Sequence, residues 1–286
     1  MTPIDATLRA AVVGDGAETT LTLDADFQGL PDAAHGGSML GLFDLLAARR
    51  GQRTVRARYL RRVPLGVPLM LTRTASSDGL ACRVAERGGA VLVDGGVDGE
   101  HLTSGVAEAA ETGVGSARGS ESAPLPVSLM CFACGIENPR GLHARLAFDA
   151  ATVSGVWAPH AAFRAGDGRV SPVALTTLLD EAAFWLGALA SGESGMTTEL
   201  TVAVHGDASA GSAVHVSGER AATRPHAADP RYWTTRVSAH DDAGRTLATA
   251  SITFVAVRGA ARKLVTGLLV MNPREVVRGV FPAYCA

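Results

Sequence analysis

Apolar and polar positions follow the same order twice along the chain: one helix-like stretch, then several strand-like stretches. Helices are expected over about residues 36–49 and 172–190, and in the second of these the leucines recur at three- and four-residue steps and form one wide apolar stripe. Segments of alternating apolar and polar residues follow each helix, at 54–60, 67–74, 80–86 and 89–93 and at 198–204, 213–219, 231–239 and 245–257. Each apolar helix face is therefore expected to pack on an antiparallel sheet.

Matching positions in the two halves indicate that this repeated order is an internal duplication. Asp44 follows His35 by nine residues in the first half, and Asp180 follows Ser171 by nine residues in the second. In both halves a turn that contains glycine then leads into a strand, although the distance from the aspartate to that turn differs. The halves therefore correspond in pattern rather than in length.

A connector divides the two copies. Residues 112–126 are rich in Gly, Ser and Pro and contain no periodic apolar pattern, which is typical of a flexible linker. We therefore expect an N-terminal domain over 1–111, a C-terminal domain over 127–258 and a separate tail over 259–286. The tail is apolar enough to dock on the domains.

The composition is that of a globular protein with no excess of basic charge. Of the 286 residues 47% are hydrophobic and 19% are charged, and 26 Lys and Arg against 28 Asp and Glu leave a net charge of −2. The longest apolar stretch, residues 170–190, carries Asp180 and Glu181 at its centre, where a bilayer would make them costly. The N-terminus lacks the pattern of a signal peptide. We expect a cytoplasmic protein with no nucleic-acid or membrane partner.

The start of each half resembles a known family. His35-Gly36-Gly37 opens an apolar helix that contains Asp44, and a strand pair joined through a Pro-Leu-Gly turn follows it. This arrangement resembles the hotdog fold of acyl-CoA thioesterases of the phenylacetate-pathway type. The second half opens with Cys-Phe-Ala-Cys-Gly-Ile-Glu-Asn-Pro-Arg-Gly-Leu from residue 131, a run that is similar to the start of such domains.

The resemblance covers about residues 20–110 and 128–257. It implies an α+β fold of two tandem hotdog domains, each a long helix wrapped by an antiparallel sheet, that pair as an intrachain pseudo-dimer. Further pairing of whole chains into a homo-oligomer is left open.

In hotdog thioesterases the site lies between two paired domains, one of which supplies a helix N-terminus and the other an acid. The resemblance thus implies that the backbone N–H groups of Gly36 and Gly37, beside His35, hold the developing oxyanion. Asp180 would act as general base toward water or as nucleophile. Thr197 or Thr198 would supply the hydroxyl that orients the water.

Further residues are expected to bind the substrate. Glu181 lies next to Asp180, and Gln28 lies near the amide that helps such enzymes to bind the carbonyl. Arg56 and Arg58 share one face of a strand by two-residue alternation, and an arginine pair suits the phosphates of coenzyme A or of a carrier-protein phosphopantetheine arm. A solvated strand face is the competing interpretation of this pair.

The second composite site is expected to be degenerate. It would join the turn at Ser171 to Asp44, but Pro172 has no N–H to donate and the Val173 side chain blocks close approach. Asp44 is therefore interpreted as structural.

No metal or organic cofactor is expected. Cys131 and Cys134 resemble half of a zinc site, but two further ligands at suitable spacing do not follow, and His143 is the only nearby candidate. We therefore interpret this run as a packed turn. The remaining histidines show no metal-ligand spacing, and the absence of a Gly-x-Ser-x-Gly motif disfavours a serine hydrolase.

The sequence therefore predicts an enzyme, an acyl-CoA thioesterase that hydrolyses an acyl-CoA or acyl-carrier-protein thioester at one composite site. The first alternative is a hotdog dehydratase or lyase-type tailoring enzyme of a biosynthetic pathway. That chemistry needs a histidine paired with a carboxylate, so the direction of His35 relative to Asp180 distinguishes the two. The second alternative is a non-catalytic acyl-binding or regulatory module.

Overall fold

The structure, a computed structural model, describes residues 2–99 and 122–285. The elements of the first half are α1 (Ile4–Ala10), β1 (Val12–Val13), β2 (Glu18–Leu21), the 3-10 turn η1 (Ala25–Phe27), α2 (Gly36–Ala47), β3 (Arg53–Tyr59), β4 (Leu69–Ala75), β5 (Gly79–Ala85) and β6 (Val91–Asp98). The elements that follow are β7 (Ala123–Pro124), β8 (Leu146–Phe148), β9 (Thr152–Trp157), η2 (Ala161–Phe163), α4 (Pro172–Ser191), β10 (Gly195–Val204), β11 (Val214–Glu219), η3 (Arg220–Ala222), β12 (Arg224–Pro225), β13 (Tyr232–His240), β14 (Thr246–Ala256), α5 (Ala261–Met271), α6 (Arg274–Val280) and η4 (Pro282–Tyr284).

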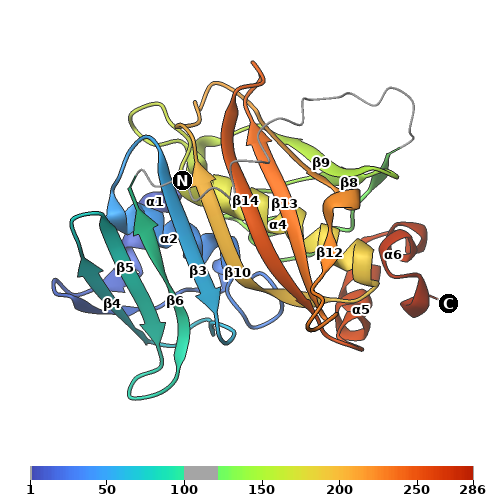
Figure 1. Cartoon of the computed structure of the whole chain (residues 1–286), viewed down its shortest axis with the longest axis horizontal. Coiled ribbons are helices and arrows are strands. Elements are labelled where there is room, and N and C mark those ends of the chain that lie inside the picture. Colours follow the sequence, from blue (N-terminus) through green and yellow to red (C-terminus); the bar gives the residue numbers. More distant parts are fainter. Residues whose placement is uncertain (1, 100–121, 286) are drawn as a thin grey trace.

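The strands form one sheet that runs through both halves (Figure 1). Its order is β1-β2-β4-β5-β6-β3-β10-β14-β13-β11-β9-β8-β7, with β12 paired to β13. The halves join where β3 pairs antiparallel with β10, from Arg53 opposite Val204 to Arg58 opposite Glu199. Each half thus contributes one side of a continuous sheet, which is the pseudo-dimer that the resemblance implied.

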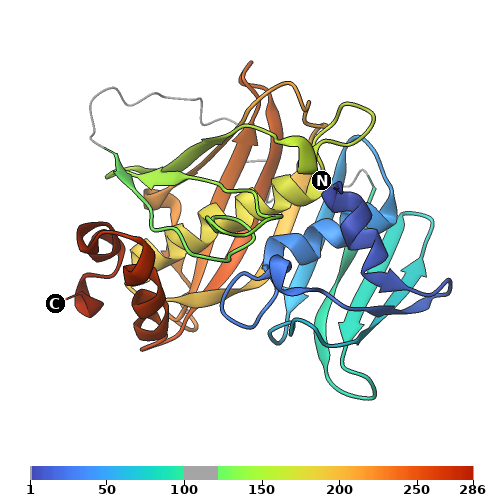
Figure 2. The same cartoon turned by 180° about the vertical axis from the view of Figure 1, so that it is seen from behind.

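Both long helices lie on the same face of this sheet (Figure 2). Helices α2 and α4 pack against each other, and their contact requires glycine. A Cβ on Gly37 would lie 2.5 Å from the Cα of Thr177, and one on Gly41 would lie 2.6 Å from the Cα of Val173. The small residues of α2 therefore allow its backbone to approach α4 closely.

Helix α4 is the buried centre of the second half. It is long and apolar enough to cross a membrane by length and composition, but 83% of its most apolar 18-residue window is buried inside the fold. It packs against β10, β11, β13 and β14 of the sheet and against α2. It is the core helix of a hotdog-like layer.

The expected connector and tail are only partly described. Of the connector expected over 112–126, residues 112–121 lie outside the described part of the chain, and Ala123–Pro124 form β7, an edge strand paired with β8. The tail expected after 258 forms α5, α6 and η4, which lie at the far end of the second half (Figure 1). The division into domains at 111 and 127 remains a prediction.

Candidate active site

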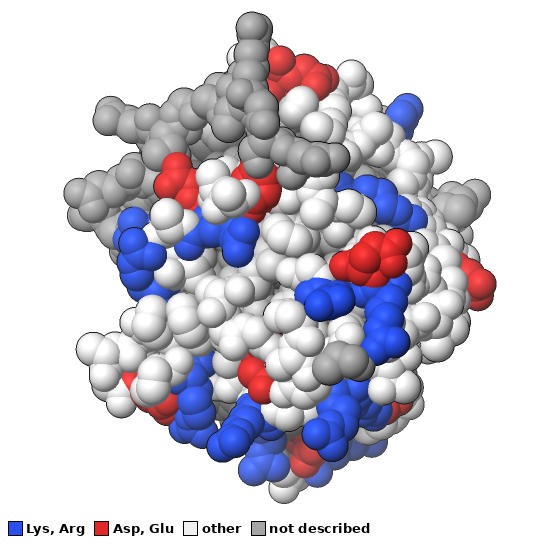
Figure 3. Space-filling model, turned by 90° about the vertical axis from the view of Figure 1, so that its right-hand side faces the viewer, with Lys and Arg blue, Asp and Glu red and all other residues white. Residues whose placement is uncertain are grey.

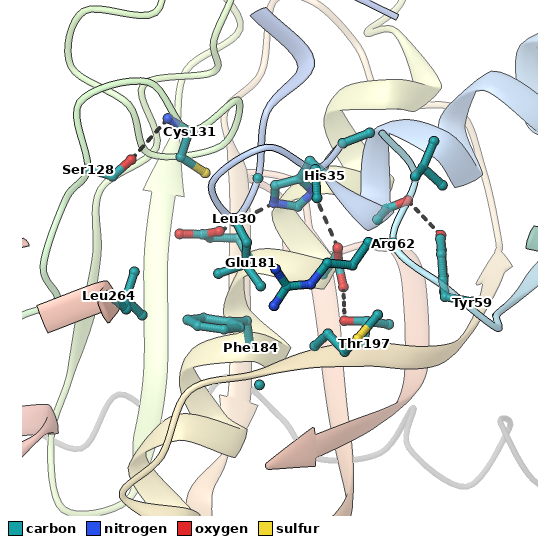
Figure 4. Close-up of a pocket in the computed structure, with 18 of the residues that line it drawn as sticks. Leu30, His35, Tyr59, Arg62, Ser128, Cys131, Glu181, Phe184, Thr197 and Leu264 are labelled. Carbon is teal, nitrogen blue, oxygen red and sulfur yellow. Dashed lines mark hydrogen bonds and ion pairs between the residues drawn. The ribbon is translucent and has the colours of Figure 1, made fainter. Parts of the chain in front are cut away.

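A pocket opens where the N-terminus of α2 meets the middle of α4. It encloses about 860 Å³, its open mouth included, and both halves of the chain line it. The residues that line it include His35, Gly36, Tyr59, Arg61, Arg62, Cys131, Cys134, Asp180, Glu181, Phe184, Trp185, Thr197, Leu264 and Leu268. The expected composite site therefore coincides with a cavity (Figure 4).

Asp180 lies at the centre of this pocket and is 4% exposed. Its Oδ1 accepts a hydrogen bond from the Thr197 hydroxyl at 2.6 Å, and its Oδ2 accepts one from the backbone N–H of Gly37 at 2.8 Å. The acid of one half is thus bonded to the first helical turn of the other half. The helix turn and the acid expected for the first composite site therefore meet, but the Gly37 N–H, which was expected to hold the oxyanion, is bonded to Asp180 instead.

His35 is the N-cap residue of α2 and lies between two carboxylates. Its Nδ1 is 3.3 Å from Asp180 Oδ2, and its Nε2 is 3.4 Å from Glu181 Oε2. Nδ1 also lies 3.1 Å from Gly37 N, but Asp180 is closer to that N–H and is the better acceptor. The histidine therefore points into the pocket, beside Asp180.

The charge of His35 is stabilised by its neighbours. Burial opposes the protonated ring, but the hydrogen bond to Glu181 and the negative charge of Asp180 outweigh it and raise the pKa of His35 to about 9. Burial likewise opposes the charged form of Glu181, yet His35 and the indole N–H of Trp185 lower the pKa of that carboxyl. At neutral pH the pocket thus holds an imidazolium next to carboxylates.

Gly36 lies at the pocket, and Gly37 lies at the contact between α2 and α4. Gly36 lines the pocket, and a Cβ on it would lie 2.8 Å from Asp180 Oδ2. Gly37 lies deeper, where its N–H is already bonded to Asp180 and its Cα faces α4. The lack of side chains here permits the contact between the helices, a reason that the sequence analysis did not consider.

The second composite position carries a buried ion pair. The carboxylate of Asp44 accepts two hydrogen bonds from Arg53, at 2.6 and 2.7 Å, and both side chains are buried. Ser171 caps α4 by accepting from Val173 N at 3.2 Å, and its hydroxyl donates to Asp5. Asp44 thus pairs with a buried arginine, which agrees with the structural role expected for it.

Besides Gly37, four of the residues expected to form the site lie outside the pocket lining. The Gln28 side chain accepts from Asp32 N at 3.4 Å, and the Thr198 hydroxyl donates to the Thr253 carbonyl at 3.2 Å. Arg56 and Arg58 lie on the exposed face of β3, where they pair with Asp98 at 2.8 Å and Glu199 at 3.3 Å. Thr197, rather than Thr198, is the hydroxyl beside the acid, and the two arginines are surface ion-pair partners.

The pocket also contains residues that the sequence analysis did not assign. Tyr59 donates its hydroxyl to the carbonyl of Gly36 at 2.6 Å, and burial raises its pKa well above 10. Arg61 and Arg62 are exposed at the mouth and form no ion pair within the described residues. Phe184 and the α5 leucines Leu264 and Leu268 form an apolar wall (Figure 4).

Cys131 and Cys134 also line this pocket and are both buried. The turn that holds them is packed, as expected: Cys131 N donates to Ser128 Oγ at 3.0 Å, and Gly135 N donates to the Cys131 carbonyl at 2.8 Å. The side chain of Cys134 lowers the pKa of the Cys131 thiol by hydrogen bonding to it. The two cysteines therefore border the candidate site as well as the protein core.

Solved structures similar to this chain share the hotdog fold. A protein of unknown function with a hotdog fold from Alicyclobacillus acidocaldarius is 12% identical, with a TM-score of 0.55, over 90% of this chain and 99% of its own. An acyl-CoA thioesterase II from Mycobacterium marinum is 11% identical, with a TM-score of 0.53, over 87% and 97%. A dehydratase from the difficidin assembly line is 14% identical, with a TM-score of 0.54, over 88% and 96%.

Each comparison covers nearly the whole of both chains. This chain therefore shares with these structures the tandem arrangement of two domains and not only the fold of one domain. At such identities they show the fold and leave the reaction open. No protein-family model matches the chain, and no curated protein matches it. The chain is thus two hotdog domains in tandem.

Proposed function

We propose that this protein is an enzyme that hydrolyses an acyl thioester in the pocket between its two halves. The observation that carries the proposal is the Asp180 carboxylate, bonded on one side to the Thr197 hydroxyl and on the other to the N-terminus of α2. A base, a group that can orient water and a helix N-terminus thus meet at one point. These are the parts that thioester hydrolysis needs.

The geometry supports a simple sequence of bond changes. A water that donates to Asp180 and is oriented by Thr197 gives its proton to the carboxylate while its oxygen attacks the thioester carbonyl. The negative charge on the carbonyl oxygen is stabilised by the N-terminus of α2 and by the positive charge on His35. The C–S bond then breaks, and the thiolate leaving group takes up the proton from Asp180.

The pocket walls fit the two ends of such a substrate. Arg61 and Arg62 lie exposed at the mouth, where their charges suit the phosphates of coenzyme A or of a phosphopantetheine arm. Phe184, Leu264 and Leu268 supply the apolar wall that an acyl chain requires. On the face that carries the C-terminal helices, basic side chains occur in several separate groups among acidic ones (Figure 3). That pattern suits a small anionic group better than a long polyanion.

Dehydration of a β-hydroxyacyl thioester is the second candidate, because His35 points into the pocket and lies 3.3 Å from Asp180. In that reaction the imidazole removes a proton from the α carbon while the acid protonates the leaving hydroxyl. A base must be unprotonated, however, and the neighbouring carboxylates raise the pKa of His35 to about 9. Hydrolysis, which uses the charged ring, is therefore favoured at neutral pH.

The experiment that tests the proposal measures thiol release from short, long and aromatic acyl-CoA esters, with enoyl formation from β-hydroxyacyl-CoA followed in parallel. We expect thiol release, and we expect Asp180→Asn to lower it by about 10²–10⁴-fold, the contribution of a general base. Asp44→Asn, which alters the corresponding acid of the other half, should release thiol at the wild-type rate where circular dichroism shows it to be folded. Enoyl formation without thiol release would instead establish the dehydratase.

A further inference from the structure

A second cluster of reactive side chains lies against the edge of the His35 ring that faces away from Asp180. A ring nitrogen of His35, the Sγ of Cys131 and a carboxylate oxygen of Glu181 all lie within 4.8 Å of one another, and all three side chains are buried. The ring nitrogen nearest Glu181 is Nε2, 3.4 Å from Oε2. In Figure 4 the thiol and the carboxylate both point toward the imidazole. The proposed hydrolysis does not use the thiol.

The donor atoms of this cluster are those that zinc prefers. Imidazole nitrogen, thiolate sulfur and carboxylate oxygen are its three protein ligand types, at about 2.0–2.3 Å from the metal. Tetrahedral geometry at those lengths separates ligand atoms by roughly 3.5 Å. The observed spacing, 4.8 Å at most, therefore needs to close by about an ångström when an ion binds.

Each ligand is oriented by a further hydrogen bond. With a metal on Nε2, the ring proton of His35 lies on Nδ1, 3.3 Å from Asp180 Oδ2, the carboxylate–histidine arrangement common around zinc. Gly37 N keeps its own bond to Asp180 at 2.8 Å, so this tautomer leaves no donor unpaired.

The other two ligands are held in the same way. Trp185 Nε1 donates to Glu181 Oε1 at 2.9 Å, which leaves Oε2 directed at His35. The backbone N–H of Ala133 lies 3.4 Å from Cys131 Sγ and stabilises negative charge on the sulfur. The cluster thus has oriented ligands before any ion is bound.

We propose that His35, Cys131 and Glu181 form a binding site for a thiophilic divalent cation, with zinc as the ion that fits best. A tetrahedral ion held by three protein ligands keeps a fourth position open, and all three residues line the pocket together with Cys134. A search for metal ligands at short spacing along the sequence does not find this site, because its ligands come from both halves of the chain, at positions 35, 131 and 181. The inference does not depend on the proposed hydrolysis.

Cobalt(II) provides the spectroscopic test, because it replaces zinc and gives thiolate-to-metal charge-transfer and tetrahedral d–d absorption. The full-length protein, reduced and stripped with a chelator, is titrated with Co²⁺ and then with Zn²⁺. We expect both absorption features to saturate at one ion per chain and to be bleached by Zn²⁺. Zinc should also raise the thermal unfolding midpoint, because it binds only the folded chain.

Matched cysteine variants assign the site. Cys131→Ser should lose the charge-transfer band, whereas Cys82→Ser, which alters a buried cysteine outside the pocket, should keep it. If Cys131→Ser does not fold, Glu181→Gln takes its place and should weaken cobalt binding at least tenfold. Wild-type protein without cobalt absorption, or a band that survives in Cys131→Ser, would overturn the proposal. Because the readout is absorbance, failure here is distinct from failure to hydrolyse thioesters.

Discussion

Asp44 and Asp180 hold matching positions in α2 and α4, nine residues after each N-cap, yet their carboxylates have different partners. Arg53 occupies both oxygens of Asp44, whereas Asp180 is bonded to a hydroxyl and a backbone N–H and faces the pocket. Both oxygens of Asp44 are thus held in a buried ion pair, and removal of this carboxylate would leave the guanidinium buried without its counter-charge. The partners rather than the position therefore separate a structural acid from a candidate base.

The Thr197 hydroxyl provides a test of how Asp180 works. Removing it in Thr197→Val deprives Asp180 Oδ1 of its 2.6 Å donor. In the proposed mechanism it also removes the oxygen that orients the attacking water. We expect kcat for thiol release to fall by about 10–10²-fold with little change in KM, since the loss affects the transition state more than binding. Thr197→Ser, which keeps the hydroxyl, is expected to retain most of the rate. Equal rates for the valine and serine variants would remove Thr197 from the mechanism.

The raised pKa of His35 makes stability depend on pH. Burial opposes the charged ring, but Glu181 and Asp180 favour it and raise its pKa from 6.5 to about 9. The stabilisation, on the order of 3 kcal/mol, is therefore fully present below pH 6.5 and is lost as the pH rises toward 9. Urea unfolding between pH 6 and 9.5 should show this decline in the wild type and a flatter profile in His35→Gln. Parallel declines in both proteins would show that His35 is not the cause.

Residue types and spacing predicted the centre of the candidate site better than its surroundings. His35, Gly36, Asp180 and Thr197 meet as expected, because short motifs fix their places on two helices and a strand. Arg56 and Arg58 were expected to contact substrate, yet alternation along β3 says only that they share a face, and that face is the solvent side of the sheet. Side chains that reach the pocket from loops far away in sequence leave no periodic signal.

At the scale of elements, the contact between α2 and α4 fixes the position of the turn at His35 and Gly36. Gly37→Ala would place a Cβ 2.5 Å from the Cα of Thr177, and backbone cannot yield as a flexible side chain does. We expect it to lower the free energy of unfolding by about 1–3 kcal/mol, the usual cost of overpacking, and to reduce thiol release.

Gly267 in α5 is the matched control, because a Cβ there would meet nothing within 4 Å. Gly267→Ala should raise the free energy of unfolding by up to about 1 kcal/mol through helix propensity alone. Chemical denaturation measures both variants. A Gly37→Ala protein as stable as Gly267→Ala would show that the helices can move apart at no cost.

Strong periodicity is what made elements predictable. The second helix was expected over 172–190 and ends at Ser191, and the last strand was expected over 245–257 and runs from Thr246 to Ala256. The sequence analysis did not predict α1, α5 or α6. Two of these are only seven residues long, and α5 buries only three of its eleven residues, so their apolar pattern is too short or too narrow to stand out.

At the scale of the whole molecule, the continuous sheet turns two domains into one site. Antiparallel pairing of β3 with β10 and packing of α2 on α4 set the turn at His35 against Asp180. A duplicated chain can lose one of its two composite sites and still work, because the surviving site draws one group from each copy. At the position of the second composite site, the structure holds the buried pair of Asp44 and Arg53 instead.

If the site is composite, neither half should be active by itself. The two halves should be active when they are present together, even as separate polypeptides. We expect residues 1–111 and 112–286, coexpressed as two polypeptides, to copurify through the β3–β10 pairing and to release thiol from the same acyl-CoA esters as the intact chain. Asp180→Asn in the second polypeptide should abolish the activity of the pair, whereas Asp44→Asn in the first should not. Thiol release by the 112–286 polypeptide alone at the rate of the pair would place the whole reaction in the second half, because the N-terminus of α2 would then be dispensable.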